Sequence, residues 1–129
     1  MGTLALLGNA LVGLANPMSF LLLVAGVAVG IVFGSIPGLS GAMAVALFLP
    51  VTFAMDSANA FTLLVALYIG GISGGLISAI LLNIPGTSSS IATCFDGAPM
   101  AKNGEAAKAL GTGVVFSFIG GLISFIILI

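Results

Sequence analysis

Apolar residues form three long stretches in this chain, separated by shorter polar or glycine-rich segments. The stretches cover residues 18–36, 58–82 and 105–129. A helix needs about 20 predominantly apolar residues to cross the hydrocarbon core of a bilayer. Each stretch is long enough to do so, and the pattern therefore predicts three transmembrane helices.

Two further apolar stretches are too short to cross a bilayer. Residues 3–15 are expected to lie at the membrane interface and to end before Pro17. Residues 42–54 contain Pro50 and are typical of a re-entrant or half-membrane helix. Asp56 then provides a polar connection and a candidate N-cap for the second long helix. The whole pattern predicts an all-α integral membrane protein.

Small residues recur at helical spacing in all three long stretches. Gly26, Gly30 and Gly34 are spaced by four residues, and Gly38 continues the series. Such a stripe lies on one helix face and lets a second helix approach closely. Similar stripes are predicted at Gly70, Gly71, Gly74, Gly75 and Ser78, and at Gly113, Ser117 and Gly121. We interpret the stripes as packing surfaces rather than ligand sites.

Two Pro-Gly motifs predict breaks in the helices, near residues 35–41 and 83–90. The triplet I-P-G occurs at 36–38 and again at 84–86, an offset of 48 residues that also pairs Ser40 with Ser88. Proline lacks a backbone N–H, and a glycine such as Gly86 adopts backbone angles closed to other residues, so a helix arriving there should end. Paired breaks in corresponding positions are the sequence sign of a transporter whose binding site lies between two repeats.

The second break carries a run of hydroxyl side chains, from Thr87 to Ser90, in an otherwise apolar region. Backbone groups freed at membrane depth are tolerated only where they face protein or a water-filled cavity. We therefore expect the hydroxyls to line such a cavity and to cap a new helix that starts near Ile91. A short polar turn at the membrane surface is the alternative. Asp56 and Asp96 each follow a break, and are either solvated acids and caps or ligands of a coupling ion.

Composition agrees with a membrane protein and excludes several functions. The chain has 129 residues, of which 60% are apolar and 4% are charged, against about 25% charged residues in soluble domains. The net charge of −1 provides no basic patch for nucleic acid, and the absence of histidine nearly excludes the usual metal and acid–base chemistry. Residues 97–108 form a strongly polar loop, and its two lysines, Lys102 and Lys108, predict that it is cytoplasmic.

The segment 71–75 reads G-I-S-G-G and fits the G-x-S-x-G pattern found around some serine nucleophiles. A nucleophilic serine needs a nearby base, yet the chain has no histidine and both lysines lie in the polar loop. We therefore expect no enzymatic activity, no cofactor and no metal, and we interpret the match as part of a packing surface. A membrane-embedded hydrolase acting through Ser73 is the alternative.

Several motifs together resemble the large membrane subunit of tripartite tricarboxylate transporters, the TctA family. They are G-S-I-P-G-L-S-G at 34–41, A-L-F-L-P-V-T-F at 46–53, Y-I-G-G-I-S-G-G at 68–75, I-L-L-N-I-P-G-T-S-S-S-I-A-T at 80–93 and D-G-A-P-M-A-K-N-G at 96–104, followed by A-L-G at 109–111. Ala98 stands where the family commonly has tyrosine, and Cys94 where it has a small or hydroxyl residue. The resemblance covers nearly the whole chain but only the N-terminal minority of a family member. We therefore expect residues 1–129 to be a single transmembrane domain from a longer transporter.

The resemblance implies a secondary transporter in the bacterial inner membrane. Such transporters work with a small membrane subunit and a periplasmic solute-binding protein that delivers a carboxylate. Uptake of citrate or a related organic acid, driven by a gradient of Na⁺ or H⁺, would be the activity. A small channel, or a helix-packing membrane protein without a substrate site, is the alternative explanation of the glycine stripes.

The residues themselves suggest how a carboxylate is held in a chain that lacks arginine. Backbone N–H groups and hydroxyls at the helix N-termini after each break would face the anion. Proline and glycine would shape the breaks, while the other side chains would contact substrate or ion. The predicted substrate-binding residues are Pro37, Gly38, Ser40, Asn83, Pro85, Gly86, Thr87, Ser88, Ser89, Ser90 and Thr93. The predicted coupling-ion residues are Asp56 and Asp96.

Overall fold

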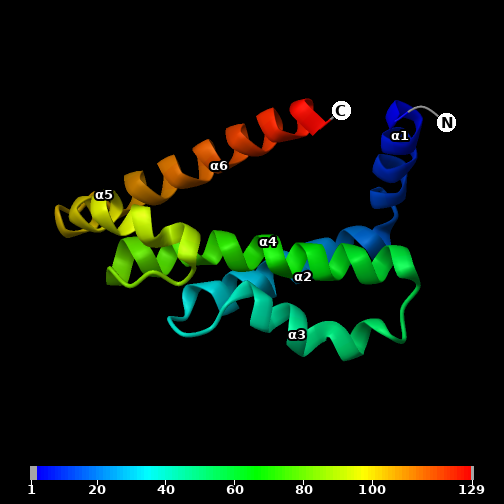
Figure 1. Cartoon of the computed structure of the whole chain (residues 1–129), viewed down its shortest axis with the longest axis horizontal. Coiled ribbons are helices and arrows are strands. Elements are labelled where there is room, and N and C mark those ends of the chain that lie inside the picture. Colours follow the sequence, from blue (N-terminus) through cyan, green and yellow to red (C-terminus); the bar gives the residue numbers. More distant parts are fainter. Residues whose placement is uncertain (1–2, 129) are drawn as a thin grey trace.

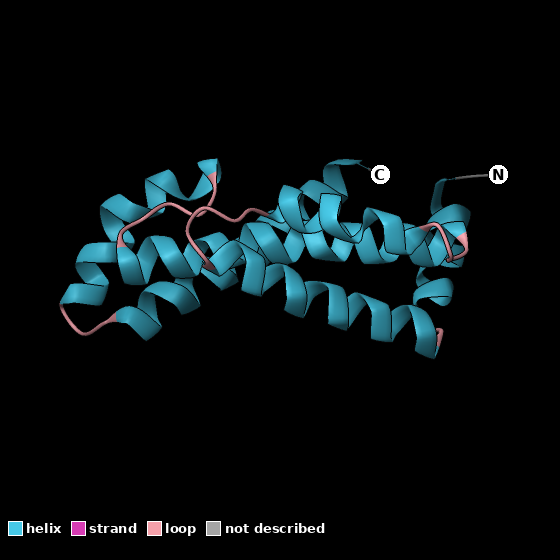
Figure 2. Cartoon of the chain, turned by 90° about the horizontal axis from the view of Figure 1, so that it is seen from below, coloured by secondary structure: helices cyan, strands magenta, loops and turns pink. Residues whose placement is uncertain are grey.

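The computed structural model describes residues 3–128, and every regular element within them is a helix (Figure 1, Figure 2). In chain order the elements are α1 (Thr3–Leu14), α2 (Pro17–Ser35), α3 (Gly41–Thr52), α4 (Ser57–Leu82), the short 3₁₀ helix η1 (Ser88–Ser90), α5 (Ile91–Lys102) and α6 (Ala106–Leu128). The predicted all-α class is therefore confirmed.

Three of the helices, α2, α4 and α6, are long and apolar enough to cross a membrane. They contain 19, 26 and 23 residues. At a rise of about 1.5 Å per residue, the longest of them, α4, extends over about 39 Å. The helix α3 is also apolar but has 12 residues. Residues 3–128 thus contain the predicted three long helices, the short apolar helix and the two breaks.

Glycines hold α2 and α4 together along much of their length. A Cβ added at Gly30 would collide with the carbonyl oxygen of Leu67, and one added at Gly70 would collide with that of Val27. Backbones this close gain van der Waals contacts that any larger residue would prevent. Most of the glycine stripes predicted on the first two long helices therefore belong to the surface through which α2 and α4 pack, whereas Gly75 faces Thr87 instead.

The short helix α3 packs against the same pair of helices. Its Ala44 is fully buried in an apolar cluster that includes Leu63 and Leu67 of α4. Gly41, at the start of α3, lies instead against Gly71, further along α4. The helix α3 therefore runs back along α4, antiparallel to it.

The polar segment 97–108 is mostly helical, so the prediction of a loop there is wrong. The helix α5 continues to Lys102, and only residues 103–105 connect it to α6. Its Gly97 packs so closely on α4 that an added Cβ would lie 2.7 Å from Cγ1 of Ile80. Packing against α4 thus stabilises helical structure in a segment whose glycine and proline are typical of a loop.

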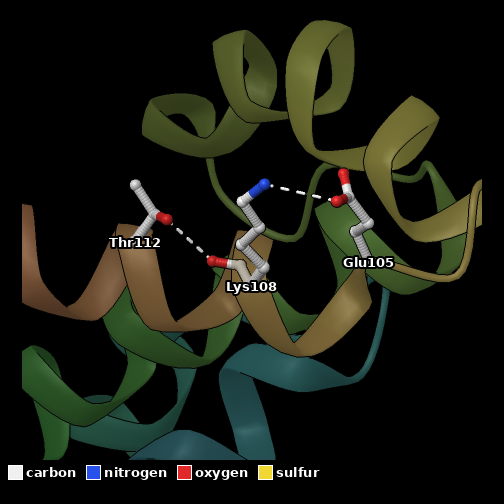
Figure 3. A network of polar contacts seen from close by, with 3 residues as sticks. All are labelled: Glu105, Lys108 and Thr112. Atoms are coloured by element: carbon white, nitrogen blue, oxygen red, sulfur yellow. Dashed lines mark hydrogen bonds and ion pairs between the residues drawn. The ribbon is translucent and has the colours of Figure 1, made fainter.

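The connection between α5 and α6 carries an exposed ion pair (Figure 3). Lys108 Nζ lies 3.2 Å from Glu105 Oε1, and the hydroxyl of Thr112 donates to the carbonyl oxygen of Lys108 at 2.7 Å. Exposed pairs of this kind contribute at most about 1 kcal/mol. Lys102 and Lys108 both lie at this end of the molecule, and the cytoplasmic location of the connection stays a prediction.

At the opposite end, polar side chains join the beginnings of α2 and α4. Asn16 caps α2, its Oδ1 accepting from Met18 N at 3.1 Å. The buried Ser19 hydroxyl donates to Oδ1 of Asn59 at 2.8 Å, and the Asn59 amide donates to Oδ1 of Asp56 at 2.7 Å. Asp56 also caps α4, as predicted. The helix α1 lies at a steep angle to α2 (Figure 1), and its interfacial location stays a prediction.

Candidate functional site: two helix N-termini on one glycine face

The first break is a tight turn between α2 and α3. The N–H of Leu39 donates to the carbonyl oxygen of Ile36 at 3.1 Å, across Pro37 and Gly38. Gly38 has a φ of +92°, and proline followed by glycine with positive φ is the type II turn. No atom lies within 4 Å of a Cβ added at Gly38. This glycine is needed for its backbone angle, and the prediction that it extends the packing stripe of α2 is wrong.

The second break ends its helix differently. Asn83 has a φ of +57°, and its N–H and that of Ile84 both donate to the carbonyl oxygen of Ser78. Asparagine adopts this left-handed conformation more readily than most residues. Gly86 has no positive φ, so the predicted unusual backbone angle at this glycine is wrong. Space requires glycine here, because an added Cβ would lie 2.5 Å from Ser78 Oγ and 2.6 Å from Gly34 O.

The two breaks have the same length but different registers. Each takes five residues from the C-cap of one helix to the N-cap of the next, at 36–40 and 83–87. The N-caps have nearly identical backbone angles, −137° and 160° at Ser40 and −136° and 159° at Thr87. The structural offset is therefore 47 residues (87 − 40), and the predicted pairing of Ser40 with Ser88 is wrong by one residue. This shift explains why the two I-P-G triplets have different conformations.

After both breaks, the chain returns to the same face of α4. Gly41, the first residue of α3, lies against Gly71, where an added Cβ would collide with the Gly41 backbone. Thr87, which precedes η1, lies against Gly75, where an added Cβ would be 2.7 Å from Thr87 Oγ1. Gly71 and Gly75 are one helical turn apart, about 6 Å along the axis. The middle of α4 falls between Ile69 and Gly70, so the Gly71 contact lies at its centre and the Gly75 contact about 8 Å from the centre, toward the C-terminus.

The helices α3 and α5 leave this meeting point in opposite directions (Figure 1). The helix α3 runs from Gly71 toward Leu63, whereas α5 runs from Gly75 toward Ile80. Their N-terminal ends therefore face the same part of α4. The first N–H groups of a helix have no partner within it, and the helix dipole adds partial positive charge there. An anion bound between the two ends would meet both sets of donors.

Hydroxyl groups surround a hollow beside the second break. Its volume is about 350 Å³, and α4, η1 and α6 form its walls. The lining residues are Ile69, Ile72, Ser73, Leu76, Ser89, Ser90 and Ser117. No charged side chain is among them. The hollow therefore combines four hydroxyls with an apolar wall made by one face of α4.

The predicted hydroxyls occupy different positions around the second break. Ser89 and Ser90 line the hollow, and Ser90 is buried, with its Oγ accepting from Thr87 N at 3.1 Å and donating to Thr87 O at 2.8 Å. The hydroxyls of Thr87 and Ser89 lie 3.0 Å apart. Ser88 is exposed, and Thr93 is half-buried on α5. The structure thus brings two of the predicted residues into one concave surface.

The predicted residues of the first break lie outside this hollow. Pro37 and Gly38 are exposed in the turn, as are Asn83 and Pro85 in the second break. Ser40 caps α3, its Oγ accepting from Met43 N at 3.2 Å. The contribution of the first break is therefore the position of the α3 N-terminus rather than a side chain in the hollow.

The two predicted coupling-ion residues lie on either side of the meeting point along α4. Asp56 is 15 residues before Gly71 (71 − 56), a distance of about 22 Å along the axis. Its pKa lies below the ordinary value of 3.8, because the backbone N–H and the side-chain amide of Asn59 donate to the carboxylate. The stabilisation from these bonds is present above the ordinary pKa and is lost as pH falls through the lowered value. Asp96 is exposed on α5, past Thr87 in the other direction.

Ser117 lines the hollow but is absent from the predicted site. The sequence placed it in a packing stripe with Gly113 and Gly121, yet no atom lies within 4 Å of a Cβ added at Gly121. Ser73 also lines the hollow, and the sequence associated it only with a nucleophile motif or a packing surface. A lone hydroxyl at the centre of an apolar helix face was the available signal in both cases.

Comparison with known proteins assigns the family of the chain. Residues 20–129 match the Tripartite tricarboxylate transporter TctA family. The chain belongs to this family. An uncharacterized 52.8 kDa protein in the TAR-I ttuC' 3' region of Agrobacterium vitis is 35% identical over 113 residues. These residues are 88% of this chain and 22% of that relative, so the chain spans about a fifth of the relative's length.

No solved structure matches this TctA chain. The family match includes both breaks, all of α4 and every residue that lines the hollow. The geometry of the candidate site therefore belongs to the TctA region of the chain. The chain belongs to a family of transporter membrane components, which agrees with its three apolar helices.

Proposed function

We propose that this chain contributes the substrate site of a transporter that takes up an organic acid. The observation that supports this is that the N-termini of α3 and η1 pack on Gly71 and Gly75, which are one turn apart on α4. In many secondary transporters, interrupted helices meet near the bilayer midplane, and their N-termini point at anionic groups of the substrate. One carboxyl group would bind between the N-termini of α3 and η1, with the hydroxyl of Ser89 as a further donor, while Ser90 supports the break through its two hydrogen bonds to Thr87.

The other predicted residues act on this site through the backbone or from its edge. Pro37 and Gly38 shape the first turn, while Asn83, Pro85 and Gly86 shape the second. Further donors or supports are provided by Ser40, Thr87, Ser88 and Thr93. Each role follows from the position of the residue at a cap, in a turn or beside the hollow.

The proposal includes the system in which the chain works. The substrate is citrate, another tricarboxylate or a related organic acid, delivered by a periplasmic solute-binding protein. A small membrane subunit completes the complex, a multi-pass assembly in the bacterial inner membrane. A gradient of Na⁺ or H⁺ drives uptake, with Asp56 and Asp96 as candidate ion ligands on either side of the substrate. The chain carries out transport and no enzymatic reaction, and it needs no cofactor.

A channel is the second candidate function, because the close glycine packing of α2 and α4 also suits a protein without a substrate site. Uptake by the complete transporter with its binding protein distinguishes the two functions. The assay offers a panel of carboxylates while the Na⁺ gradient and pH are varied separately. Saturable uptake of a carboxylate that depends on one gradient supports the transporter, whereas flux proportional to concentration and independent of both gradients supports the channel.

The same assay tests the position of the site. Loss of one hydrogen bond to a charged group costs about 1.5–3 kcal/mol, or roughly ten- to a hundredfold in affinity. Ser89→Ala should therefore raise the half-saturation concentration by about tenfold or more, and Ser88→Ala should raise it less, because Ser88 lies outside the hollow. Unchanged kinetics in both variants, and in Thr87→Ala, would place the substrate site elsewhere in the protein.

A further inference from the structure

The hollow contains two serines that the proposed carboxyl-binding site does not use. Ser89 and Ser90 belong to the second break, whereas Ser73 comes from α4 and Ser117 from α6. Ser73 lies on the helix face formed by Ile69, Ile72 and Leu76, where every other residue is apolar. One side of the hollow is thus formed by the break, and the sides formed by α4 and α6 each present a single hydroxyl.

Ser73 and Ser117 differ from several of the hydroxyl residues within the long helices. Thr62, Ser78 and Thr112 each donate to a carbonyl oxygen three or four residues earlier in their own helix. In the described part of the chain, neither Ser73 nor Ser117 makes such a bond, and Ser124 does not either. Both side chains are exposed in the described part of the chain. Both hydroxyls are therefore available to a molecule in the hollow.

The hollow suits an organic acid better than a bare cation. A cation bound directly by protein would need several oxygen ligands close around it, and carboxylates usually compensate its charge. The hollow has a volume of about 350 Å³ and no acidic lining residue. It has the size of small-molecule sites, which combine apolar walls with a few polar groups. Ile69, Ile72 and Leu76 would contact the hydrocarbon part of such an acid.

We propose that Ser73 and Ser117 bind a second carboxyl group of the substrate, on the walls of the hollow that α4 and α6 provide. This inference rests on the proposed function, since it assumes that a first carboxyl group is held at the second break. The two serines then determine specificity. They raise the affinity for acids with two or more carboxyl groups. An acid with one carboxyl group does not contact these hydroxyls, so its affinity does not change when they are removed.

The test is uptake by the complete transporter carrying Ser73→Ala, Ser117→Ala or the control Ser124→Ala. Ser124 lies two turns beyond Ser117 on α6 and does not line the hollow. Half-saturation is measured for the transported polycarboxylate, with citrate and succinate as first probes. Competition by propionate, a monocarboxylate, is measured in parallel. We expect the half-saturation concentration to rise about tenfold in Ser73→Ala and Ser117→Ala, with no change in propionate inhibition or in Ser124→Ala.

Each outcome supports or overturns the inference. Ser73→Thr and Ser117→Thr keep the hydroxyl and should restore part of the lost affinity. Equal weakening of citrate and propionate binding, or unchanged kinetics in both alanine variants, would overturn it while carboxylate uptake by the wild type still supports the proposed function. Absence of carboxylate uptake by the wild type would overturn the proposed function itself.

A second measurement tests the inference if an alanine variant fails to accumulate in the membrane and its uptake cannot be assayed. Ser117→Cys, in a protein whose other cysteines are replaced, presents a thiol in the same hollow. Citrate should slow the labelling of this thiol by a small polar reagent, and propionate should not. Labelling at the same rate with and without citrate would overturn the assignment of Ser117.

Discussion

The two breaks show how one short motif can serve two physical purposes. Both connect a membrane helix to a shorter helix in five residues, and both end on N-caps with nearly the same backbone angles. The glycine of the first break, Gly38, has a positive φ and open space around it. The glycine of the second, Gly86, has no positive φ and is enclosed by Gly34 and Ser78. A shared I-P-G triplet therefore does not imply a shared reason for its glycine.

The first break therefore needs glycine for its backbone conformation, and the second needs glycine because there is no room for a side chain. In the first break, the turn itself determines the path, and its residues stay exposed. In the second break, Gly86 lies against both α2 and α4, close to Gly34 and Gly75. The second break is therefore held by packing as well as by its own turn. The same set of substitutions should therefore rank differently in severity at Gly38 and at Gly86.

The largest effects are expected at the two glycines. Gly86→Val should abolish uptake, and even Gly86→Ala should cost about 1–3 kcal/mol of stability through overpacking. Gly86→Asn should be worse than Gly86→Ala, because the side chain is larger. At Gly38 the order reverses, since asparagine tolerates a positive φ better than alanine and nothing fills the space. Uptake and thermal unfolding of the detergent-solubilised transporter provide the measurement.

The control is the order of the variants within each break. Each pair of alanine and asparagine variants shares one position, so differences in expression between positions do not affect the comparison. The same order at Gly38 and Gly86 would contradict the distinction between the breaks. Normal uptake by a well-expressed Gly86→Val protein would contradict the close approach of the second break to α2.

A smaller effect is expected at the residues that end α2 and α4. Asn83 is left-handed, whereas its structural counterpart Ile36 is extended, with a φ of −92°. Asn83→Ala should therefore cost about 1–2 kcal/mol, the penalty of an L-residue in this conformation. Asn83→Gly should cost little, and Ile36→Ala should show no conformational penalty. Thermal unfolding gives the three values.

Uptake by the same variants distinguishes two roles of Asn83. If its side chain contacts the substrate, Asn83→Gly will raise the half-saturation concentration while the protein stays stable. If the residue only ends α4, Asn83→Gly will transport normally. Equal stability of the alanine and glycine variants would contradict the left-handed conformation.

The smallest expected effect is a difference in labelling rate that leaves transport unchanged. Cys94 is half-buried on α5, one turn after Ser90, whose carbonyl oxygen accepts its thiol at 3.7 Å. A polar thiol reagent should label Cys94 if water reaches the second break, and bound carboxylate should slow the reaction. The labelling rate is measured in membranes, with and without substrate, in a transporter whose other cysteines are replaced.

The matched probe for the first break is Leu47→Cys on α3, in a protein that lacks Cys94. Leu47 is exposed and corresponds to Cys94 by the structural offset of 47 residues (94 − 47). Neither Leu47 nor Cys94 lines the hollow, but Cys94 is hydrogen-bonded to Ser90, which does. We therefore expect the thiol of Leu47→Cys to react at a rate that carboxylate does not change. Equal protection of both thiols would show a general closure of the protein, and no labelling of Cys94 under any condition would contradict a wet second break.

Much of the fold follows from the hydrophobic pattern, because long apolar helices leave few alternatives in a membrane. The three long helices, the short apolar helix and the cap at Asp56 all agree with the prediction. Glycine spacing also predicted the α2–α4 surface, since close backbone approach needs the smallest residues. The loop expected at 97–108 was wrong because Gly97 acts there through its contact with Ile80, which no local rule detects.

Less of the candidate site could be predicted from the sequence. The hydroxyl run and the breaks mark one side of the hollow, as Ser89 and Ser90 show. Ser117 comes from a helix that begins 16 residues after η1 (106 − 90), and its position depends on how α6 folds back. The one-residue shift between the breaks was also hidden, because the I-P-G match aligns letters while the helix ends align at Ser35 and Leu82.

The shortness of α3 and α5 has a consequence for how the protein enters the membrane. Each has 12 residues and extends over about 18 Å, whereas the hydrocarbon core is about 30 Å thick. Neither helix can be inserted as an independent span, whereas α2, α4 and α6 can. The helix α4 has to be inserted in the membrane before α3 and α5 can pack on its glycine face. Assembly of the site is therefore a late step of biogenesis, and a chain released before α4 is complete would contain neither N-terminus in its final position.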